Sequence, residues 1–110
     1  MSYLGINIGG TTCSVSRGTA AGEILEREAF PTTDRARTIA GLKRLAAKLC
    51  RDDVMACGIS CGGPLDAEAG LVLSPPNLPG WDRVPIVKEI SEATGKPAWL
   101  MNDANAGGLA

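Results

Sequence analysis

Asp103 is the residue of this sequence best suited to acid–base chemistry. It follows an apolar segment, 97–101, that we expect to be a buried strand, and Asn102 directly precedes it. A carboxylate near the end of such a strand can act as a general base and accept a proton from a substrate hydroxyl. Asn102 or Asp103 can equally cap a following Ala-rich helix and complement its dipole. The two roles do not exclude each other.

A glycine doublet supplies a second element of chemistry. Gly9 and Gly10 follow an apolar segment, 4–8, and precede Thr11 and Thr12. Adjacent glycines can take positive φ and allow close approach of another group, and successive backbone N–H groups form a concavity that binds anions. The turn therefore suits a phosphate, although Gly-Gly is also a favoured pair in a plain β-hairpin.

Three further positions accompany this turn. Asn7 interrupts the apolar strand, and because a buried amide needs partners we expect it to face the phosphate turn rather than the core. Gly63 belongs to a second doublet, which is either part of the same site or an ordinary turn. Asn77 lies in a proline-stiffened loop, 74–81, that forms either a pocket wall or a rigid connector with Trp81 closing the core.

The hydrophobic pattern predicts an α/β fold that brings these loops together. We expect three strands at 3–8, 13–16 and 23–30, followed by a helix at 34–50 and strands at 54–60 and 71–73. A second helix at 82–94 and a strand at 97–101 come next, and residues 102–106 begin a final helix. Short turns favour an antiparallel meander of the first three strands, and strand–helix–strand units favour parallel crossovers. The result is a five-stranded mixed sheet, order 3-2-1-4-5, with flanking helices.

The sequence of the first predicted helix, 34–50, shows an apolar stripe and candidate N-cap residues. Its stripe is spaced by three and four residues and comprises Ile39, Leu42, Leu45, Ala46 and Leu49. Residues 32–34 supply N-cap candidates. In such a sheet, ligands bind outside the carboxyl ends of parallel strands, so the turns at 9–12, 62–64 and 102–103 should meet at one edge.

Composition narrows the class of protein. The 110 residues are 45% hydrophobic and 21% charged, with a net charge of −1 and no basic run. This balance argues against nucleic acid or a membrane as partner, and neither a membrane span nor a signal peptide is apparent. We expect a cytoplasmic protein.

The spacing of the cysteines indicates a role in packing and not in metal binding. The four cysteines, at 13, 50, 57 and 61, lack the paired spacing of a zinc site, and the sequence has no His. We expect reduced thiols that pack as small apolar residues, and we assign no metal ligand.

Four segments, in order along the chain, resemble conserved segments of the ROK family of sugar kinases and sugar-responsive repressors: 4–12, 58–66, 73–81 and 102–106. The resemblance implies that residues 1–110 are the N-terminal lobe of an actin-like, ribonuclease-H-like ATPase. It implies an enzyme that transfers the γ-phosphoryl group of ATP to a glucose-like hexose, with Mg²⁺.

The resemblance also assigns roles to individual residues. Asp103 falls on the catalytic base, and the sugar ligands fall on Gly63, Asn77 and Asn102. The ATP-binding positions fall on Asn7, Gly9, Gly10, Thr11 and Thr12. The family usually has Asp where this chain has Asn7, which bears on Mg²⁺ handling because an uncharged amide is the weaker ligand.

The C-terminal lobe, with the adenosine pocket and the family's zinc site, is expected outside residues 1–110. We therefore expect the isolated chain to be inactive and its exposed lobe face to favour self-association. Two alternatives stay open: the sugar-sensing domain of a ROK repressor, and a degenerate sugar-binding pseudokinase prompted by Asn7. Repressors carry a winged helix before the phosphate motif, whereas Met1 lies close before it here, so we expect the kinase.

Overall fold

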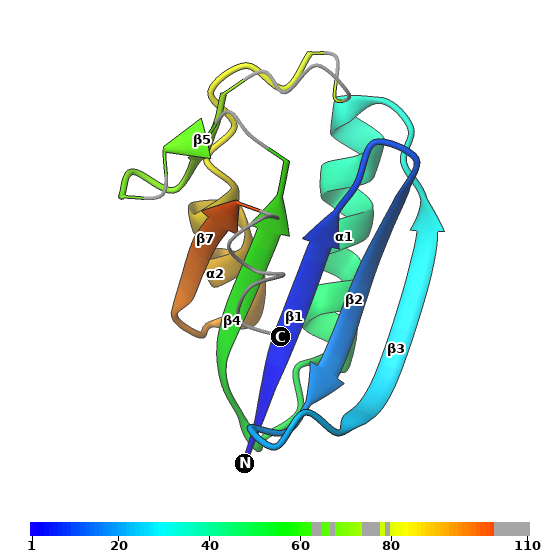
Figure 1. The fold of residues 1–110 in the computed structure, drawn as a ribbon, viewed down its shortest axis with the longest axis vertical. Helices are drawn as coiled ribbons and strands as arrows, with labels where there is room; N and C mark the ends of the chain where they lie inside the picture. Colours follow the sequence, from blue (N-terminus) through cyan, green and yellow to red (C-terminus); the bar gives the residue numbers. More distant parts are fainter. Residues whose placement is uncertain (63–64, 67, 74–77, 79, 103–110) are drawn as a thin grey trace.

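The computed structural model describes residues 1–62, 65–66, 68–73, 78 and 80–102, and for Asn102 the backbone alone. The elements are β1 (Ser2–Ile8), β2 (Thr12–Gly18), β3 (Ile24–Pro31), α1 (Arg35–Leu49), β4 (Val54–Cys61), β5 (Leu65–Asp66), β6 (Leu71–Val72), α2 (Ile86–Thr94) and β7 (Ala98–Asn102). Figure 1 shows α1 and α2 on the same side of one sheet, with β5 near the carboxyl end of β4.

The main sheet has the strand order β3-β2-β1-β4-β7, and β5 and β6 form a separate antiparallel hairpin. The pairs β1–β2 and β2–β3 are antiparallel, and the pairs β1–β4 and β4–β7 are parallel. Strands joined by short turns pair directly, whereas each parallel step needs a crossover through a helix. The predicted five-stranded mixed sheet of order 3-2-1-4-5 is confirmed, with β7 as the fifth strand of the main sheet.

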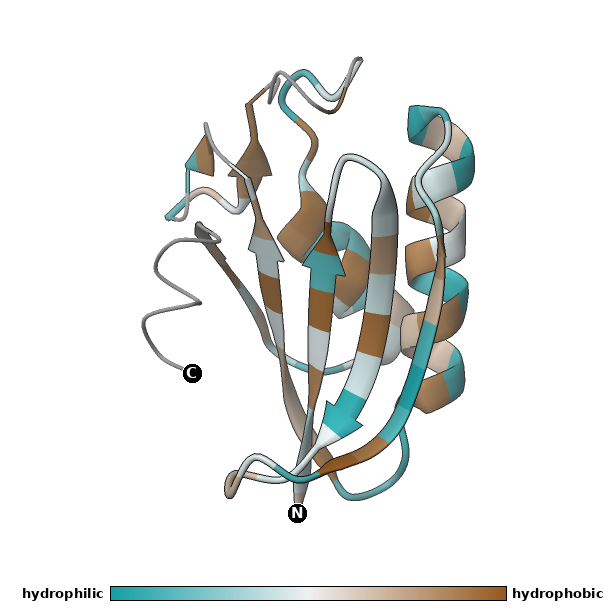
Figure 2. Ribbon diagram, turned by 45° about the vertical axis from the view of Figure 1, so that its right-hand side comes forward, coloured by the Kyte–Doolittle hydropathy of each residue, from teal (hydrophilic) through white to brown (hydrophobic). Residues whose placement is uncertain are grey.

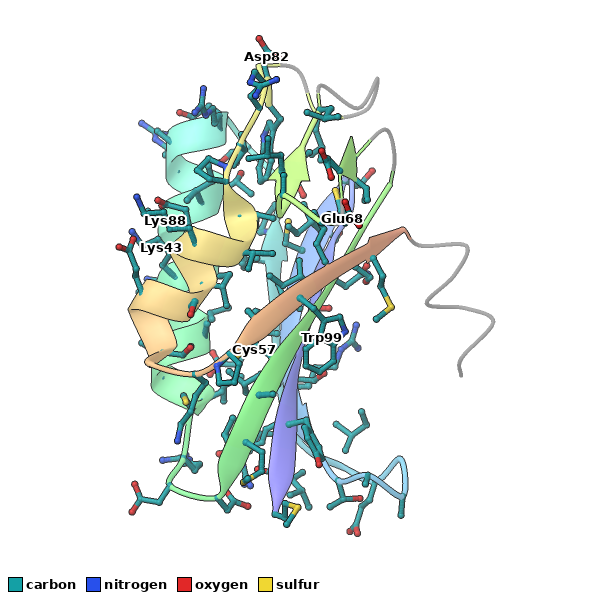
Figure 3. The ribbon with its side chains drawn as sticks, turned by 90° about the vertical axis from the view of Figure 1, so that its left-hand side faces the viewer. Lys43, Cys57, Glu68, Asp82, Lys88 and Trp99 are labelled. Atoms are coloured by element: carbon teal, nitrogen blue, oxygen red, sulfur yellow. The ribbon has the colours of Figure 1, made fainter. Side chains whose placement is uncertain are left out.

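Alternation along the strands gives the sheet two unlike sides. In β1 the buried apolar residues are Leu4, Ile6 and Ile8, and the residues between them, Gly5 and Asn7, are exposed. Figure 2 shows the resulting bands of apolar and polar residues along the central strands. Figure 3 shows α1 and α2 on one side of the sheet and Trp99 on the other. We call this second side the open face; it carries Gly5, Asn7, Ser60 and Trp99.

Helix α1 follows the predicted stripe but is not capped as expected. It buries Leu42, Leu45, Ala46 and Leu49 against the sheet, and Ile39 is partly buried. Asp34 holds the N-cap position without a side-chain hydrogen bond to the helix, and lies instead 3.8 Å from Arg37 in an exposed ion pair. Thr38, which is fully buried, ties the start of α1 to the preceding loop, because its Oγ1 accepts a hydrogen bond from the Thr33 N–H at 3.0 Å.

Helix α2 begins at Ile86, four residues later than the predicted start at position 82. Residues 82–85 do not join the helix, because Val84 and Val72 exchange two backbone hydrogen bonds of 2.9 Å in an isolated antiparallel bridge. Arg83 also takes a φ of 53°, which is incompatible with a right-handed helix. At its other end α2 stops as predicted at Gly95, whose φ of 72° is the left-handed conformation of a helix C-cap. Within the described residues, no helix is long and apolar enough to cross a membrane.

The core extends from the sheet to the loop before α2. Trp81 is 1% exposed and packs in the core cluster together with Leu78. The interpretation of Trp81 as a side chain that closes the core is confirmed, whereas the prediction of a pocket wall with Asn77 lies outside the described residues. All four cysteines are free thiols, and Cys13, Cys57 and Cys61 are buried, which confirms their prediction as small core residues.

Candidate active site

The carboxyl ends of three parallel strands lie side by side. The register pairs Ile8 at the end of β1 with Cys61 at the end of β4, and Cys61 in turn with Asn102 at the end of β7. The phosphate turn follows Ile8 directly, and Gly62 follows Cys61. Because parallel strands end at the same edge of the sheet, the described backbone brings the starts of all three predicted loops to one place.

The predicted phosphate turn, residues 9–12, forms a β-hairpin turn, which confirms that interpretation of the sequence, whereas phosphate binding by the turn stays a prediction. β1 and β2 pair antiparallel up to Ile8 and Cys13, and the N–H of Gly9 donates to the carbonyl of Thr12 at 3.2 Å. Neither Gly9 nor Gly10 has a positive φ, contrary to our expectation. Glycine is needed at position 9 for another reason: a Cβ there would lie 2.7 Å from the Thr12 carbonyl oxygen.

The carbonyl groups of Gly9, Thr11 and Thr12 in this turn are already engaged. The Gly9 carbonyl accepts a hydrogen bond of 2.7 Å from the Thr32 hydroxyl, and the Thr11 carbonyl accepts one of 2.9 Å from the Thr32 N–H. The Thr12 carbonyl is taken by Gly9. The negative ends of these peptide dipoles are therefore directed to protein donors rather than left free.

Two N–H groups of the same turn, those of Gly10 and Thr11, are available. Within the part of the chain that the structure describes, no acceptor is hydrogen-bonded to the N–H of Gly10 or Thr11. Thr11 and Thr12 are exposed, and their hydroxyls add further donors. Two free N–H groups beside three carbonyls that already have donors favour an anion, as a phosphate requires.

Asn7 lies on the open face and is exposed, not buried as the sequence led us to assume. Its Oδ1 accepts a hydrogen bond of 3.0 Å from the Ser60 hydroxyl of the neighbouring strand. Both side chains line a shallow depression of about 270 Å³ on the open face, together with Gly5, Ser14, Gly58 and Met101. The amide of Asn7 therefore stays close to the phosphate turn without entering the core.

The described residues around Asn7 and the phosphate turn offer few ligands for Mg²⁺. Mg²⁺ prefers carboxylate oxygens together with substrate phosphates, and Asn7 offers only an amide oxygen that already accepts from Ser60. Among the described residues no cluster of three or more acidic, Cys or His side chains could hold a metal ion. The described residues thus fit the phosphates of a nucleotide better than they fit its metal ion.

Cys57 is a buried thiol of β4. Burial raises the pKa of Cys57, and the nearby Thr94 hydroxyl offsets only part of this effect. A thiol with a raised pKa is a poor nucleophile because little thiolate forms. Cys57 is therefore a structural residue, in keeping with its full burial.

Several predicted site residues fall outside the described part of the chain. These are Gly63, Asn77 and Asp103, together with the side chain of Asn102. Their assigned roles as sugar ligands and catalytic base stay predictions, as does the final helix.

Two residues that contact the site were missed by sequence reasoning. Ser60 was taken only as the end of an apolar run, and Thr32 only as an N-cap candidate. Thr32 lies 23 positions from Gly9 in the sequence, so no local pattern reveals their contact. For Ser60 a signal existed, since strand pairing places it beside Asn7 once the parallel register is known.

Comparisons with known proteins agree with this geometry. The profile of the ROK family matches residues 3–110. The glucokinase of Thermotoga maritima is 33% identical over 110 residues, which cover 96% of this chain and 35% of that protein. The chain thus spans about a third of the length of the curated relatives that it matches.

Solved structures give the same result. A ROK hexokinase from Thermus thermophilus superposes with a TM-score of 0.85 at 32% identity, covering 99% of this chain and 37% of that one. A ROK family glucokinase from Streptomyces griseus, solved with glucose and AMPPNP, gives 0.86 at 27% identity, covering 98% and 35%. A ROK family transcriptional regulator gives 0.81 at 24% identity, covering 98% and 29%, which shows a shared fold alone. With the sheet order, the phosphate turn and the match over residues 3–110 in agreement, this chain belongs to the ROK family and has its actin-like fold.

Proposed function

We propose that residues 1–110 are the N-terminal lobe of an ATP-dependent hexose kinase. The observation that carries this proposal is the phosphate turn, in which the carbonyls of Gly9, Thr11 and Thr12 are occupied by donors of the protein. The N–H groups of Gly10 and Thr11 are left for an anion. Phosphoryl transfer depends mainly on positioning and charge neutralisation, and such a turn provides both for a phosphate chain.

The relatives support a sugar as the acceptor. The matched proteins include a glucokinase and a hexokinase, and one structural neighbour was solved with glucose and AMPPNP. In this proposal the sugar lies beyond the carboxyl ends of β4 and β7, where Gly63, Asn77 and Asn102 supply its ligands. The phosphate chain of ATP lies against the turn after β1.

The proposed reaction is a direct displacement. Asp103 takes the proton of a sugar hydroxyl, the sugar oxygen bonds to the γ-phosphorus, and the bond to the β–γ bridging oxygen breaks, so ADP leaves. Mg²⁺, when bound with ATP, would neutralise charge on the phosphates. Asn7, two residues before the turn, is a described side chain that could contact this ion or its water. We place the zinc site of the family in the lobe outside this chain.

One alternative is favoured by a specific residue. Asn7 stands where the family resemblance leads us to expect Asp, so a sugar-binding pseudokinase is the second candidate. For the repressor alternative, the structural neighbour of that class supports the fold alone.

A kinase assay of the complete reading frame that contains this chain tests the proposal. ADP release would be coupled to NADH oxidation with glucose, mannose, N-acetylglucosamine and N-acetylmannosamine as acceptors. We expect turnover with at least one sugar and none without sugar. Sugar binding by calorimetry without turnover would favour the pseudokinase, and failure to bind AMPPNP would refute the nucleotide site.

A further inference from the structure

Thr32 lies in the loop between β3 and α1 and contacts the phosphate turn through the carbonyl groups of the turn. It is partly buried and follows Pro31, which pairs with Thr12 across the β2–β3 register. The loop is fixed on its other side by α1, because the buried Thr38 hydroxyl oxygen accepts from the Thr33 N–H. A continuous set of contacts therefore runs from α1 through this loop to the turn.

Two hydrogen bonds from this single residue reach two carbonyls of the turn. The Thr32 hydroxyl donates to the Gly9 carbonyl at 2.7 Å, and the Thr32 N–H donates to the Thr11 carbonyl at 2.9 Å. The hydroxyl proton is used on Gly9, so the buried Cys13 thiol, 3.2 Å away, acts as donor to the Thr32 oxygen. The same thiol lies 4.0 Å from the Gly9 carbonyl.

These bonds decide which polar groups of the turn face an incoming anion. Each peptide unit has a carbonyl at one end and an N–H at the other, so the direction of one fixes the direction of the other. The Gly9 carbonyl belongs to the same peptide unit as the Gly10 N–H, which has no acceptor among the described residues. Holding the Gly9 carbonyl toward Thr32 therefore orients the Gly10 N–H as well.

Loss of the hydroxyl would remove this restraint. The Gly9 carbonyl would then lack its main donor, and glycine offers little conformational resistance to rotation of the peptide. A carbonyl that turns toward the phosphate site repels the ligand, and the matching N–H no longer donates to it. The Thr11 carbonyl would keep its bond, because its donor is the main chain of Thr32.

We propose that Thr32 is a positioning residue that sets the phosphate turn through its hydroxyl, without contact to the nucleotide. This inference rests on the proposed function, since it assumes that the turn binds the phosphates of ATP. It deepens that function by assigning the turn's orientation to a residue on another loop.

The test compares Thr32→Val, Thr32→Ser and Thr33→Val in the complete reading frame. Valine keeps the shape of threonine and removes the hydroxyl, whereas serine keeps the hydroxyl. Thr33 is exposed, and its hydroxyl has no partner among the described residues, so Thr33→Val is a matched control in the same loop. Calorimetry would give the dissociation constants for AMPPNP and for the sugar, and thermal unfolding would report stability.

We expect Thr32→Val to weaken AMPPNP binding about threefold to tenfold, the usual effect of one lost hydrogen bond. Sugar binding should stay unchanged, Thr32→Ser should bind AMPPNP as the wild type does, and so should Thr33→Val. This split between nucleotide and sugar, and the rescue by serine, would not arise from a general loss of structure.

Three results would overturn the inference while leaving the proposed function intact. These are wild-type affinity of Thr32→Val for AMPPNP, equal weakening of AMPPNP and sugar, and equal behaviour of the serine and valine variants. If the wild-type protein itself does not bind AMPPNP, the proposed function fails, and the inference fails with it.

Discussion

At the level of single residues, the site is defined by groups that are engaged and groups that are free. The Gly9 carbonyl is held by Thr32 and the Asn7 amide oxygen by Ser60, whereas the N–H groups of Gly10 and Thr11 have no acceptor among the described residues. Gly10 is partly buried and Thr11 is exposed, so both N–H groups can be reached by a ligand. In the proposed function they are the donors that hold a phosphate.

Replacement of Asp103 by alanine is predicted to stop turnover without unfolding the protein. General base catalysis contributes about 10²–10⁴-fold to a rate, so kcat should fall by that factor while the midpoint of thermal unfolding changes little. Steady-state kinetics of the complete protein would measure this. Asp52→Ala is the control, because Asp52 is exposed in the turn before β4, at the end of that strand opposite the predicted site. Normal turnover of Asp103→Ala would remove the assignment of the base.

Replacement of Asn7 by aspartate is predicted to raise kinase activity. Aspartate can keep the hydrogen bond from Ser60 and adds a charged oxygen that Mg²⁺ prefers. Groups that orient a metal ion typically change activity by about tenfold or more, so we expect a gain of this order, largest at low Mg²⁺. Kinetics over a Mg²⁺ titration would show it. An unchanged Mg²⁺ dependence would mean that this position does not limit metal handling.

At the level of elements, the hairpin of β1 and β2 is what gives the phosphate turn its shape. The antiparallel register brings Gly9 against Thr12 so closely that the position has no room for a side chain. A similar close approach occurs at the far end of β2, where a Cβ at Gly18 would lie 2.9 Å from the Glu23 carbonyl oxygen. Gly18 has a similarly close backbone contact but lies at the end of β2 away from the proposed phosphate site, which allows a matched comparison.

Alanine at Gly9 is predicted to disturb both stability and nucleotide binding, whereas alanine at Gly18 should disturb stability alone. Each forces a backbone contact apart, and overpacking of this kind costs about 1–3 kcal/mol. Thermal unfolding and AMPPNP calorimetry of both variants would separate the two effects. If Gly18→Ala weakens AMPPNP binding as much as Gly9→Ala does, the loss reflects general strain and not the phosphate turn.

At the level of the whole molecule, an ionic cluster closes the edge of the sheet opposite the site. Glu26 of β3 pairs with Arg17 of β2 at 3.0 Å and with Arg51 at 2.6 Å, and Arg17 also pairs with Asp53 at 3.2 Å. Hydrogen bonds from Arg51 and then from Arg17 lower the pKa of Glu26 to about 2. The cluster joins β2 and β3 to the connection between α1 and β4.

This lowered pKa predicts a loss of stability in acid. Because the pKa of Glu26 is lower in the folded protein than its usual value of 4.5, the ionised carboxylate stabilises the fold fully above about pH 4.5. That contribution is lost as the pH falls from 4.5 toward 2. Thermal unfolding between pH 7 and pH 2 should therefore show that Glu26→Gln lowers the midpoint at neutral pH and that the difference from wild type shrinks in acid.

The control for this experiment is Asp34→Asn. It also removes one negative charge, but from an exposed pair with Arg37 in which the two atoms are 3.8 Å apart. Exposed pairs of this kind contribute little, so this variant should unfold close to the wild type at neutral pH. A difference between Glu26→Gln and wild type that stays constant down to pH 2 would contradict the linkage.

The sequence alone determined the order of the sheet, the stripe of α1 and the position of the phosphate turn. These depend on local periodicity, on short turns that force neighbouring strands to pair, and on the handedness of crossovers, all of which are properties of nearby residues. The family was also apparent from four short segments, and the match over residues 3–110 confirms it.

Only the tertiary structure decided how the site is built. It showed that α2 starts at Ile86, because Val84 is held by the distant Val72, and that Asn7 is exposed beside Ser60. It also showed that Thr32, which the sequence presented only as a cap candidate, donates hydrogen bonds to the Gly9 and Thr11 carbonyls of the turn. These contacts join residues 12 to 53 positions apart, and the sheet register that brings them together is set by packing of the whole fold, which no local pattern encodes.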